Sequence, residues 1–445
     1  MTEGSLDAPT RHPLAWTDPE FADPAKLDAE MRRVFDICHG CRRCFNLCDS
    51  FPRLFDLVDA SPSGEIEGVK SEDFASVVEA CTLCDLCFMT KCPYVPPHPF
   101  NLDFPHLMLR HRFAELQLGK REGLPGELAK TDRNGKLGGA VAPLANWAID
   151  RSNSLTRPLM EKVVDVHRDA ALPQFHGKTF ALQAKAAPLD VNREAPAFGR
   201  KAVLFATCFA NYHNPRIGMA TRAVLAKNGV ETEIVYPRCC GMPLLEQGDL
   251  AKVAQAAREI SRALLSWVDR GYDVIALVPS CALMLKFEWP LILTEDEEVK
   301  RLSAATSDIS EYIVDLAKTA GLAPGLQALE GGVALHIACH ARAQNMGRKA
   351  AEMLALIPGA DLSVIERCSA HGGSWGVRKE NFELAIKLGR PVARQAKDSG
   401  KRHVASECPL AAAHILQGIE KLGGSSPAKA PHPIEIFALS YGVWS

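Results

Sequence analysis

The sequence predicts an α+β multidomain protein, with an α-helical N-terminal module followed by two repeated α/β units that contain parallel sheets. Apolar residues recur at helical spacing near the N-terminus, and after Lys201 short apolar runs alternate with helix-like stretches. Cysteines in this second part recur at an interval of about 130 residues, which indicates an internal repeat. The expected boundaries are a helical module over 1–118, a connecting region over 119–200, and repeat units over 201–328 and 329–445.

The composition is that of an ordinary globular protein. The chain has 445 residues, 47 % hydrophobic and 23 % charged, and its net charge of −2 gives no reason to expect a nucleic-acid partner. Residues 1–16 show no secretory signal, and no apolar run is long enough to cross a bilayer, so no transmembrane segment is expected. We therefore expect a cytoplasmic location, with peripheral attachment to the inner face of a membrane left open.

Helical periodicity places the first cysteines at helix ends. A helix over 26–37 is expected to lead into Cys38, and a second, starting near Phe74, is expected to lead into Cys81. One further helix is expected near 158–167. Proline, glycine and acidic residues predict irregular structure elsewhere, over 1–25, 49–70 and the glycine cluster 135–139.

From Lys201 onward, buried strands are expected to alternate with helices, as in parallel α/β units. The expected helices cover 216–227, 250–269, 346–356 and 380–398. The expected strands cover 202–207, 232–236, 273–279, 333–338, 361–365 and 403–406.

The cysteines show the strongest chemical pattern. There are 15, and without a secretory signal the compartment is expected to be reducing, which favours metal ligation over disulfides. Eight of them form two motifs: Cys38-x2-Cys41-x2-Cys44-x3-Cys48, and Cys81-x2-Cys84-x2-Cys87-x4-Cys92 followed by Pro93.

Each three-cysteine run can wrap one [4Fe–4S] cluster, while the remote fourth cysteine ligates the other cluster. The first cysteine set is therefore Cys38, Cys41, Cys44 and Cys92, and the second cysteine set is Cys81, Cys84, Cys87 and Cys48. Asp49 stands where proline usually follows the fourth cysteine, and the last spacing is one residue longer than usual. The long link between the motifs resembles the helical ferredoxin modules of respiratory dehydrogenase subunits. The alternative, two zinc sites, is disfavoured because zinc motifs use paired cysteine knuckles.

The C-terminal half carries a repeated cysteine pattern. Cys208, Cys239 and Cys281 precede Cys339, Cys368 and Cys408 by 131, 129 and 127 residues, respectively. Each of the six follows a predicted strand. Because the carboxyl ends of parallel strands share one edge of a sheet, the three cysteines of each copy are expected to converge there.

These fragments resemble the CCG (cysteine-rich) domain family, which includes heterodisulfide reductase subunits, the glycolate oxidase iron–sulfur subunit and the C subunit of anaerobic glycerol-3-phosphate dehydrogenase. The resemblance rests on Cys239-Cys240-Gly241 and on the segments CHARAQNMG and HGGSWGVRKEN. The order of a ferredoxin module and two such units is closest to the glycerol-3-phosphate dehydrogenase component. Gly241 is expected to let the backbone approach the site closely.

The resemblance implies two further sites, both of which depart from the family's five-cysteine motif. Met284 replaces the last cysteine of the first copy, so the third cysteine set is Cys208, Cys239, Cys240 and Cys281. It is expected to hold a third iron–sulfur cluster, with redox-active thiols or a structural role as alternatives. In the second copy Ser369 and Ala411 replace cysteines. The fourth cysteine set, Cys339, Cys368 and Cys408, then needs another ligand for zinc or a cluster, and His371 is favoured over His340.

No nucleotide-binding or hydrolase motif is evident, so we expect no flavin or NAD on this chain. The resemblance implies an electron-transfer subunit that receives electrons from a flavoprotein partner acting on glycerol 3-phosphate or a 2-hydroxy acid. The acceptor would be quinone, through a membrane partner, or another molecule. The alternative from another class is a heterodisulfide-reductase-like subunit acting on a thiol or disulfide, and a scaffold protein with structural metal is disfavoured.

Overall fold

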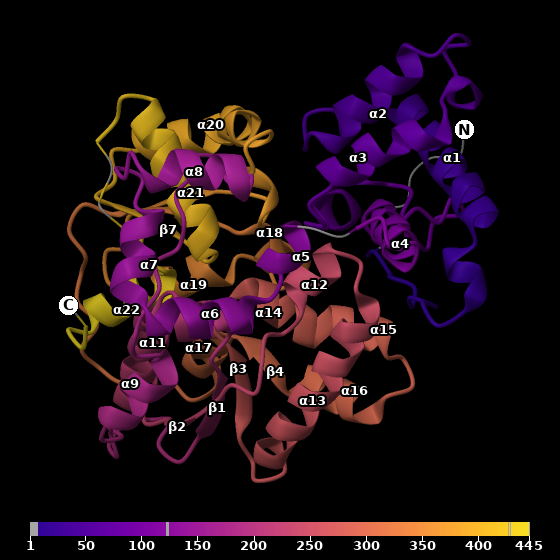
Figure 1. Ribbon diagram of the computed structural model, residues 1–445. Helices are drawn as coiled ribbons and strands as arrows, with labels where there is room; N and C mark the ends of the chain where they lie inside the picture. Colours follow the sequence, from indigo (N-terminus) through magenta and orange to yellow (C-terminus); the bar gives the residue numbers. More distant parts are fainter. Residues whose placement is uncertain (1–7, 122–123, 426, 428, 445) are drawn as a thin grey trace. The chain divides into compact units, whose positions relative to one another are not determined.

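The structure, a computed structural model, describes residues 8–121, 124–425, 427 and 429–444. The chain forms two compact units (Figure 1). The first unit comprises Met1–Ala129, Pro243–Ala254 and Leu291–Thr294, and the second comprises Lys130–Met242, Gln255–Pro290 and Glu295–Ser445. Residues 130–200, expected as a connecting region, thus belong to the unit that contains the sheets.

The first unit is helical. Its main helices are α1 (Pro24–Cys41), α2 (Ser50–Asp59), α3 (Phe74–Ala80) and α4 (Phe104–Gln117), with the short helix α5 (Leu124–Leu128) and four single turns, η1 (Pro19–Ala22), η2 (Ile66–Gly68), η3 (Ser71–Asp73) and η4 (Cys87–Lys91). Asp23 caps α1 by accepting a hydrogen bond from the Lys26 amide, and Arg42 ends this helix in a left-handed conformation.

Aromatic contacts join the helices of the first unit. The Phe35 ring of α1 meets Phe74 of α3 edge-on at 5.1 Å, and Phe51 of α2 packs on Phe104 of α4 at 4.6 Å. The buried Ser50 hydroxyl donates to the Val77 carbonyl over 2.7 Å. The cysteine loops therefore extend from a single packed helical core.

Two sequence expectations of irregular structure are wrong. Within 49–70, residues 50–59 form α2, because Phe51, Leu54 and Phe55 lie on one buried helical face that outweighs the local proline. The glycine cluster 135–139 lies in helix α6 (Thr131–Ala140), not in a loop. There Gly135 and Gly138 allow close packing, since an added Cβ would collide with the rings of Tyr212 and Phe175. Of the 1–25 segment, residues 1–7 lie outside the described residues.

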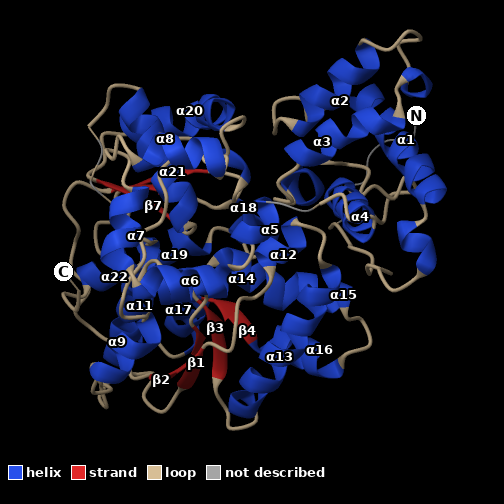
Figure 2. Cartoon of the chain, viewed as in Figure 1, coloured by secondary structure: helices blue, strands red, loops and turns tan. Residues whose placement is uncertain are grey.

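The second unit contains two parallel sheets (Figure 2). The first has the order β2-β1-β3-β4, and the second has the order β6-β5-β7. All six expected strands are present, whereas β4 was not expected because its three residues, Thr-Ser-Asp, are polar. The strands are β1 (Lys201–Phe205), β2 (Glu231–Val235), β3 (Asp273–Ala276), β4 (Thr306–Asp308), β5 (Val333–His336), β6 (Leu362–Ile365) and β7 (His403–Ser406).

The sheets share a hydrophobic core. Leu204 and Ile275 of the first sheet belong to the same buried cluster as Leu335 and Ala405 of the second. Strands buried on both faces are expected to be continuously apolar, which explains why short runs such as AVLF predicted them. The order β6-β5-β7 reproduces β2-β1-β3, as a repeated unit would.

Helices cover the sheets and follow each strand. Between residues 131 and 200, where one helix was expected, the second unit has α6, α7 (Ala142–Ile149), α8 (Thr156–Val163) and α9 (Phe180–Ala186). Among the described residues, no helix combines the length and apolar character needed to cross a membrane. The remaining helices and turns are α10 (Cys208–Tyr212), α11 (Pro215–Lys227), α12 (Met242–Glu246), α13 (Leu250–Val268), α14 (Pro279–Leu283), η5 (Met284–Glu288), α15 (Trp289–Ile292), α16 (Glu297–Ala305), α17 (Ile309–Thr319), α18 (Cys339–Ala343), α19 (Lys349–Ala355), η6 (Trp375–Val377), α20 (Phe382–Asp398), α21 (Pro409–Lys421) and α22 (Pro433–Ser440).

Arg112 stabilises the first unit through buried hydrogen bonds. Its buried guanidinium donates to the carbonyl oxygens of Val78, Cys81 and Glu246. The change Arg112→Met leaves these acceptors without their donor, so it should lower the local unfolding free energy of α3 by about 3 kcal/mol. Hydrogen exchange of the α3 amides measures this loss. Arg53→Met, which removes an ion pair with Asp49 nearer the surface, is the matched control and should change exchange little. Equal exchange in both variants would contradict the assignment.

Candidate metal centres

The first cysteine set comes together in the structure. Burial, and next the neighbouring charges of Cys92, Cys44 and Cys41, raise the pKa of Cys38 well above its ordinary value. Burial, followed by Cys92 and Cys41, raises the pKa of Cys44 to about 12. Cys92 is remote in sequence from the other three, so tertiary folding brings it to this site.

The second cysteine set also comes together. Burial, and then the charges of Cys84, Cys81 and Cys48, raise the pKa of Cys87 well above its ordinary value. Cys44 of the first set adds a smaller effect on Cys87, so the two sets are neighbours. The structure therefore places Cys92 beside the first motif and Cys48 beside the second.

Backbone geometry shapes the second motif. Cys81 ends α3, and Leu83 and Asp85 both have left-handed backbone angles, with φ of 48° and 60°. The Arg11 guanidinium holds this loop by contacting Asp85 at 2.7 Å and Asp103 at 2.8 Å. The turn η4 then runs from Cys87 to the residue before Cys92. The left-handed residues and the Arg11 contacts therefore fix the course of the loop between Cys81 and Cys87.

The donor chemistry of both sets fits an iron–sulfur cluster. Buried thiols that raise one another's pKa resist ionisation unless a positive centre compensates them. Arg43 and Lys91 lower the pKa of Cys44, but their effects are smaller than those of burial and neighbouring thiols. Iron ions bound by the sulfur atoms would supply the missing positive charge.

The third cysteine set gathers at the carboxyl edge of the first sheet. Cys208 begins α10 just after β1, Cys239 and Cys240 follow β2, and Cys281 follows β3. The Sγ atoms of Cys208 and Cys239 are 3.7 Å apart, and those of Cys240 and Cys281 are 3.3 Å apart. Four thiols thus converge from three strand ends, as the parallel-sheet argument predicts.

Strained and polar residues position this set. Thr207 precedes Cys208 with a φ of 53°, and its side chain accepts a hydrogen bond from the Ala210 amide at 3.1 Å, which caps α10. Hydrogen bonds with Cys208, and next with Cys240, lower the pKa of Cys239 well below its ordinary value, whereas the hydrogen bonds with Cys239 raise the pKa values of Cys208 and Cys240. The four thiols are therefore close enough to share hydrogen bonds with one another.

Sequence reasoning missed two residues beside this set. Asp132 of α6 accepts hydrogen bonds from the Cys239 amide, at 2.9 Å, and from the Tyr236 hydroxyl. The buried Trp289 indole donates to the Cys240 carbonyl at 3.2 Å. No sequence signal could have revealed Asp132, because it lies 107 residues from its partner in a segment without cysteines.

The fourth cysteine set lies at the corresponding edge of the second sheet. Cys339 begins α18 after β5, Cys368 follows β6, and Cys408 caps α21 after β7. The Cys368 Sγ atom accepts a hydrogen bond from the Ala370 amide at 3.3 Å, and burial raises the Cys368 pKa. The set therefore has the same topological position as the third set.

Histidines surround the fourth set in different roles. The His371 Nδ1 atom accepts from the Gly373 amide at 3.1 Å, and burial, then His414, lower the His371 pKa to about 3. The ring is thus neutral, as a metal ligand must be. The His340 Nδ1 atom lies 2.8 Å from the hydroxyl of Ser280, the residue before Cys281. His340 therefore links the third and fourth sets.

His336 is a positioning residue that the sequence did not single out. Its Nε2 atom donates to the Arg367 carbonyl at 2.9 Å, so its Nδ1 atom accepts from the Ser406 hydroxyl at 2.8 Å. The Ser406 oxygen in turn accepts from the Cys408 amide at 3.3 Å. This chain of bonds ties together all three strand ends of the second sheet, next to Cys368 and Cys408.

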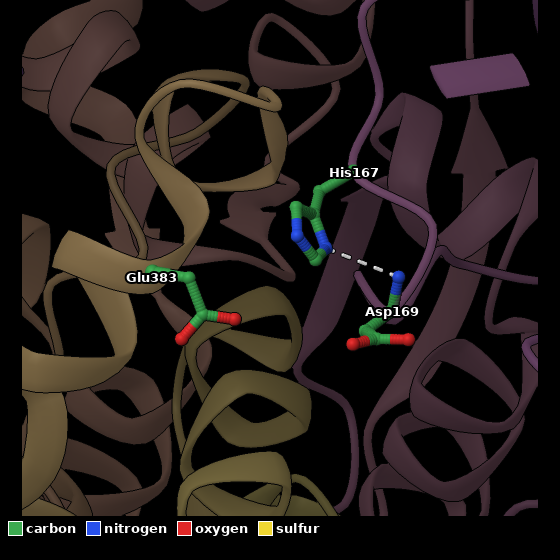
Figure 3. Close-up of side chains that lie close together, drawn as sticks. All are labelled: His167, Asp169 and Glu383. Atoms are coloured by element: carbon green, nitrogen blue, oxygen red, sulfur yellow. Dashed lines mark hydrogen bonds between the residues drawn. The ribbon is translucent and has the colours of Figure 1, made fainter. Parts of the chain in front are cut away.

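A separate surface cluster contains His167, Asp169 and Glu383, each with a ligand atom within 4.8 Å of the others (Figure 3). The His167 Nδ1 atom already accepts from the Asp169 amide at 3.1 Å, and its ring stacks on Phe382 at 4.2 Å. Asp169 and Glu383 are exposed, and exposed acidic groups commonly gather without an ion. Its existing contacts account for the orientation of His167.

Two buried carboxyl groups lie near the strand ends of the second unit. Burial, and then the charge of Asp308, raise the pKa of Glu407 to about 8. Burial raises the pKa of Asp308 to about 6. The Glu407 carboxylate accepts from the Ala338 amide at 3.0 Å, next to Cys339. The second unit therefore keeps one or both acids protonated below neutral pH.

The parallel sheets with cysteines at their carboxyl edges place this chain in the class of cysteine-rich proteins. Comparison with known proteins relates it to components of oxidoreductases. Residues 202–286, which include the whole third cysteine set, match the cysteine-rich domain CCG. The chain therefore carries a CCG domain.

Two of the three relatives described here are named as subunits of oxidoreductases. Over 316 residues, or 70 % of this chain and 75 % of the relative, it is 27 % identical to the C subunit of anaerobic glycerol-3-phosphate dehydrogenase from Escherichia coli K12. It is 28 % identical over 249 residues to the B subunit of fumarate reductase (CoM/CoB) from Methanothermobacter marburgensis, covering 55 % of this chain and 47 % of the relative. It is 28 % identical over 214 residues to lactate utilization protein A from Geobacillus thermodenitrificans, covering 46 % and 82 %.

Gly241 tests the local geometry of the third set. Its φ of 91° is strained for any residue with a side chain, so Gly241→Ala should lower the unfolding free energy of the second unit by roughly 1–2 kcal/mol. Calorimetric unfolding measures the change. The control is Gly177→Ala, where the added Cβ would make an ordinary contact 3.6 Å from the Gly139 carbonyl oxygen. An undiminished stability of Gly241→Ala would show that this backbone conformation is not required.

The raised pKa of Asp308 makes the stability of the second unit depend on pH. Its folded-state pKa of about 6 exceeds its ordinary value of 3.8, so the unfolded chain ionises first and stability falls as pH rises between these values. Asp308→Asn should remove about 3 kcal/mol of that fall, since each pKa unit is worth about 1.4 kcal/mol. Thermal unfolding measured from pH 4 to 7 tests this. Asp296→Asn controls for the helix cap; a wild-type pH profile for Asp308→Asn would refute the prediction.

Proposed function

We propose that this chain is the iron–sulfur electron-transfer subunit of a multi-subunit dehydrogenase. It receives electrons from a flavoprotein partner that oxidises glycerol 3-phosphate or a 2-hydroxy acid, and passes them toward quinone or another acceptor. The observation that carries the proposal is the meeting of Cys92 with the first motif and of Cys48 with the second. The names of the relatives, subunits of a dehydrogenase and of a reductase, support the assignment to a complex.

The cysteine sets have distinct roles in this proposal. The first and second sets each hold a [4Fe–4S] cluster, which supplies one-electron transfer when bound. The third set holds a further iron–sulfur cluster, and the fourth set, with His371 as its favoured extra ligand, holds zinc or a cluster. The protein's own part is to gather the thiols, exclude water from them and fix their orientation.

We infer a partner because the sequence lacks a motif for binding a hydride-accepting cofactor. Oxidation of an alcohol group removes a hydride, which requires an acceptor such as flavin or nicotinamide. The sequence has no motif for either, so a flavoprotein subunit would carry out that step. A cytoplasmic location, with peripheral attachment to the inner face of the membrane, would suit a quinone acceptor.

Metal analysis of the anaerobically purified chain tests this proposal. Two [4Fe–4S] clusters give about eight irons per chain, and a cluster in the third set raises this to about twelve. Cys92→Ser should remove the cluster of the first set, with a loss of about four irons, and leave the second cluster visible by EPR after reduction. The matched control is Ser369→Ala in the loop beside the fourth set, which should keep the full iron content.

Two results would overturn the proposal. Colourless, iron-free protein would exclude electron transfer through clusters. A Cys92→Ser variant that retains every iron would show that Cys92 is not a ligand of the first set.

A specific observation keeps a second function open. The short Sγ separations in the third set, together with the lowered pKa of Cys239, are also suited to chemistry on a thiol or disulfide substrate. In that case the chain would resemble heterodisulfide reductase, and a thiol added to the oxidised protein would produce a new EPR signal. In the electron-transfer proposal the signal stays unchanged.

A further inference from the structure

The two N-terminal motifs carry different charges at equivalent positions. Between the second and third cysteines, the first motif has Arg42-Arg43 and the second has Asp85-Leu86. Immediately before the fourth cysteine, the first motif has Leu47 and the second has Lys91. These side chains adjoin ligand cysteines in the sequence, so their charges lie close to any cluster that the motifs hold.

Folding increases this difference between the motifs. Since Cys92 lies beside the first motif and Cys48 beside the second, Lys91 accompanies the first set and the uncharged Leu47 accompanies the second. Burial and the neighbouring cysteines raise the pKa of Cys44, and both Lys91 and Arg43 oppose that rise. Basic side chains from both motifs therefore meet at the first set.

The charges that reach the first set are all basic and only partly neutralised. Apart from other cysteines, the charged side chains with the largest effects on Cys38, Cys44 and Cys92 are Arg33, Arg43 and Lys91. Two arginines of this region have carboxylate partners, Arg42 with Asp59 and Arg33 with Glu30. Arg43 and Lys91 are exposed, and no carboxylate of the described residues forms an ion pair with either. Two positive charges therefore remain uncompensated beside the four thiols.

The second set lies among balanced charges. The Arg112 guanidinium donates to the Cys81 carbonyl, and Arg11 contacts Asp85 at 2.7 Å and Asp103 at 2.8 Å. The charges of Asp85 and Asp103 act on the Cys81 thiol in the opposite direction to that of Arg112. Two guanidinium groups thus face two carboxylates, and no net positive charge remains.

Hydrogen bonds to sulfur are present at both sets, with a hydroxyl donor at the first. The Tyr94 hydroxyl donates to the Cys41 sulfur, and the Tyr94 amide donates to the Cys92 sulfur. At the second set, the Leu83 amide donates to the Cys81 sulfur. Net charge is therefore the property that distinguishes the surroundings of the two sets.

We propose that Arg43 and Lys91 give the cluster of the first set a higher reduction potential than the cluster of the second set. Reduction adds one negative charge to a cluster, and nearby positive charges stabilise the reduced form. One electron then passes from the reduced cluster of the second set to the oxidised cluster of the first, and no proton or chemical group is transferred. The inference rests on the proposed function, since it concerns two bound clusters, and it gives electron transfer within the first unit a direction.

Potentiometric titration of the anaerobically purified full chain, followed by EPR, tests the proposal. The Cys92→Ser variant, which lacks the first cluster, identifies the EPR signal of the second. In the wild-type protein the first cluster should become reduced at a higher potential than the second. Arg43→Gln should lower the ratio of reduced to oxidised first cluster at a fixed potential about tenfold, which corresponds to about 59 mV for one electron. Lys91→Gln should shift this ratio in the same direction.

Matched variants separate the effect of charge from that of structure. Arg43→Lys keeps the positive charge and should keep the potential of the first cluster. Lys26→Gln removes an equal charge from the first turn of α1, about 18 Å along the helix axis from Cys38. This control should leave both potentials unchanged, because an exposed charge at that distance is screened by solvent and salt.

Three results would overturn the proposal. A second cluster that is reduced at a higher potential than the first would reverse the direction. Wild-type potentials in the double variant Arg43→Gln with Lys91→Gln would show that these charges do not set the order. An Arg43→Lys variant shifted as far as Arg43→Gln would make the role of Arg43 structural. The iron content is measured in parallel: about eight or more irons per chain with any of these results refutes this inference alone, whereas iron-free protein refutes the proposed function itself.

Discussion

The cost of ionising thiols that are buried close together is the constraint on which the cysteine sites of this chain depend. Burial first, and then the neighbouring thiols, raise the pKa values of Cys38 and Cys87, so gathering thiolates away from water is unfavourable for the apoprotein. The surrounding fold has to impose this arrangement. Arg112 does so by fastening the helix that leads into Cys81, and Thr207 does so with a strained backbone before Cys208.

The two sheets have the same strand topology, but different side chains surround their cysteines. In both, the central strand comes first in the chain and the next two strands flank it, so three cysteine-bearing loops meet at one edge. The first edge is supported by Asp132 and Trp289, and the second by His336. The same backbone arrangement therefore permits two chemically different sites, one with four thiols and one with three thiols and nearby histidines.

Polar contacts also determine which side chains the second unit exposes. Arg157 and Asn146 bond to backbone groups of the segment after α8, and those bonds determine which side of α7 and α8 faces inward. The apolar residues are exposed because polar anchoring, rather than burial of leucine, holds these helices.

The sequence alone determined the features that depend on spacing along the chain. The two N-terminal motifs, the six strands that end in cysteine loops and the repeat interval were all visible, because helix and strand periods and ligand spacing are local properties. Helices α2 and α6 were missed, because the local signals of proline and glycine were outweighed by packing against Phe104 and Tyr212.

Only the tertiary structure decided which residues support each site. Asp132, His336 and Arg112 act on partners 31 to 134 residues away, through hydrogen bonds that no periodicity encodes. The exposure of Leu155, Leu159 and Val163 likewise emerged only in three dimensions. A leucine stripe in a sequence predicts burial, and the buried guanidinium of Arg157 reverses that prediction because an arginine inside must keep its hydrogen bonds.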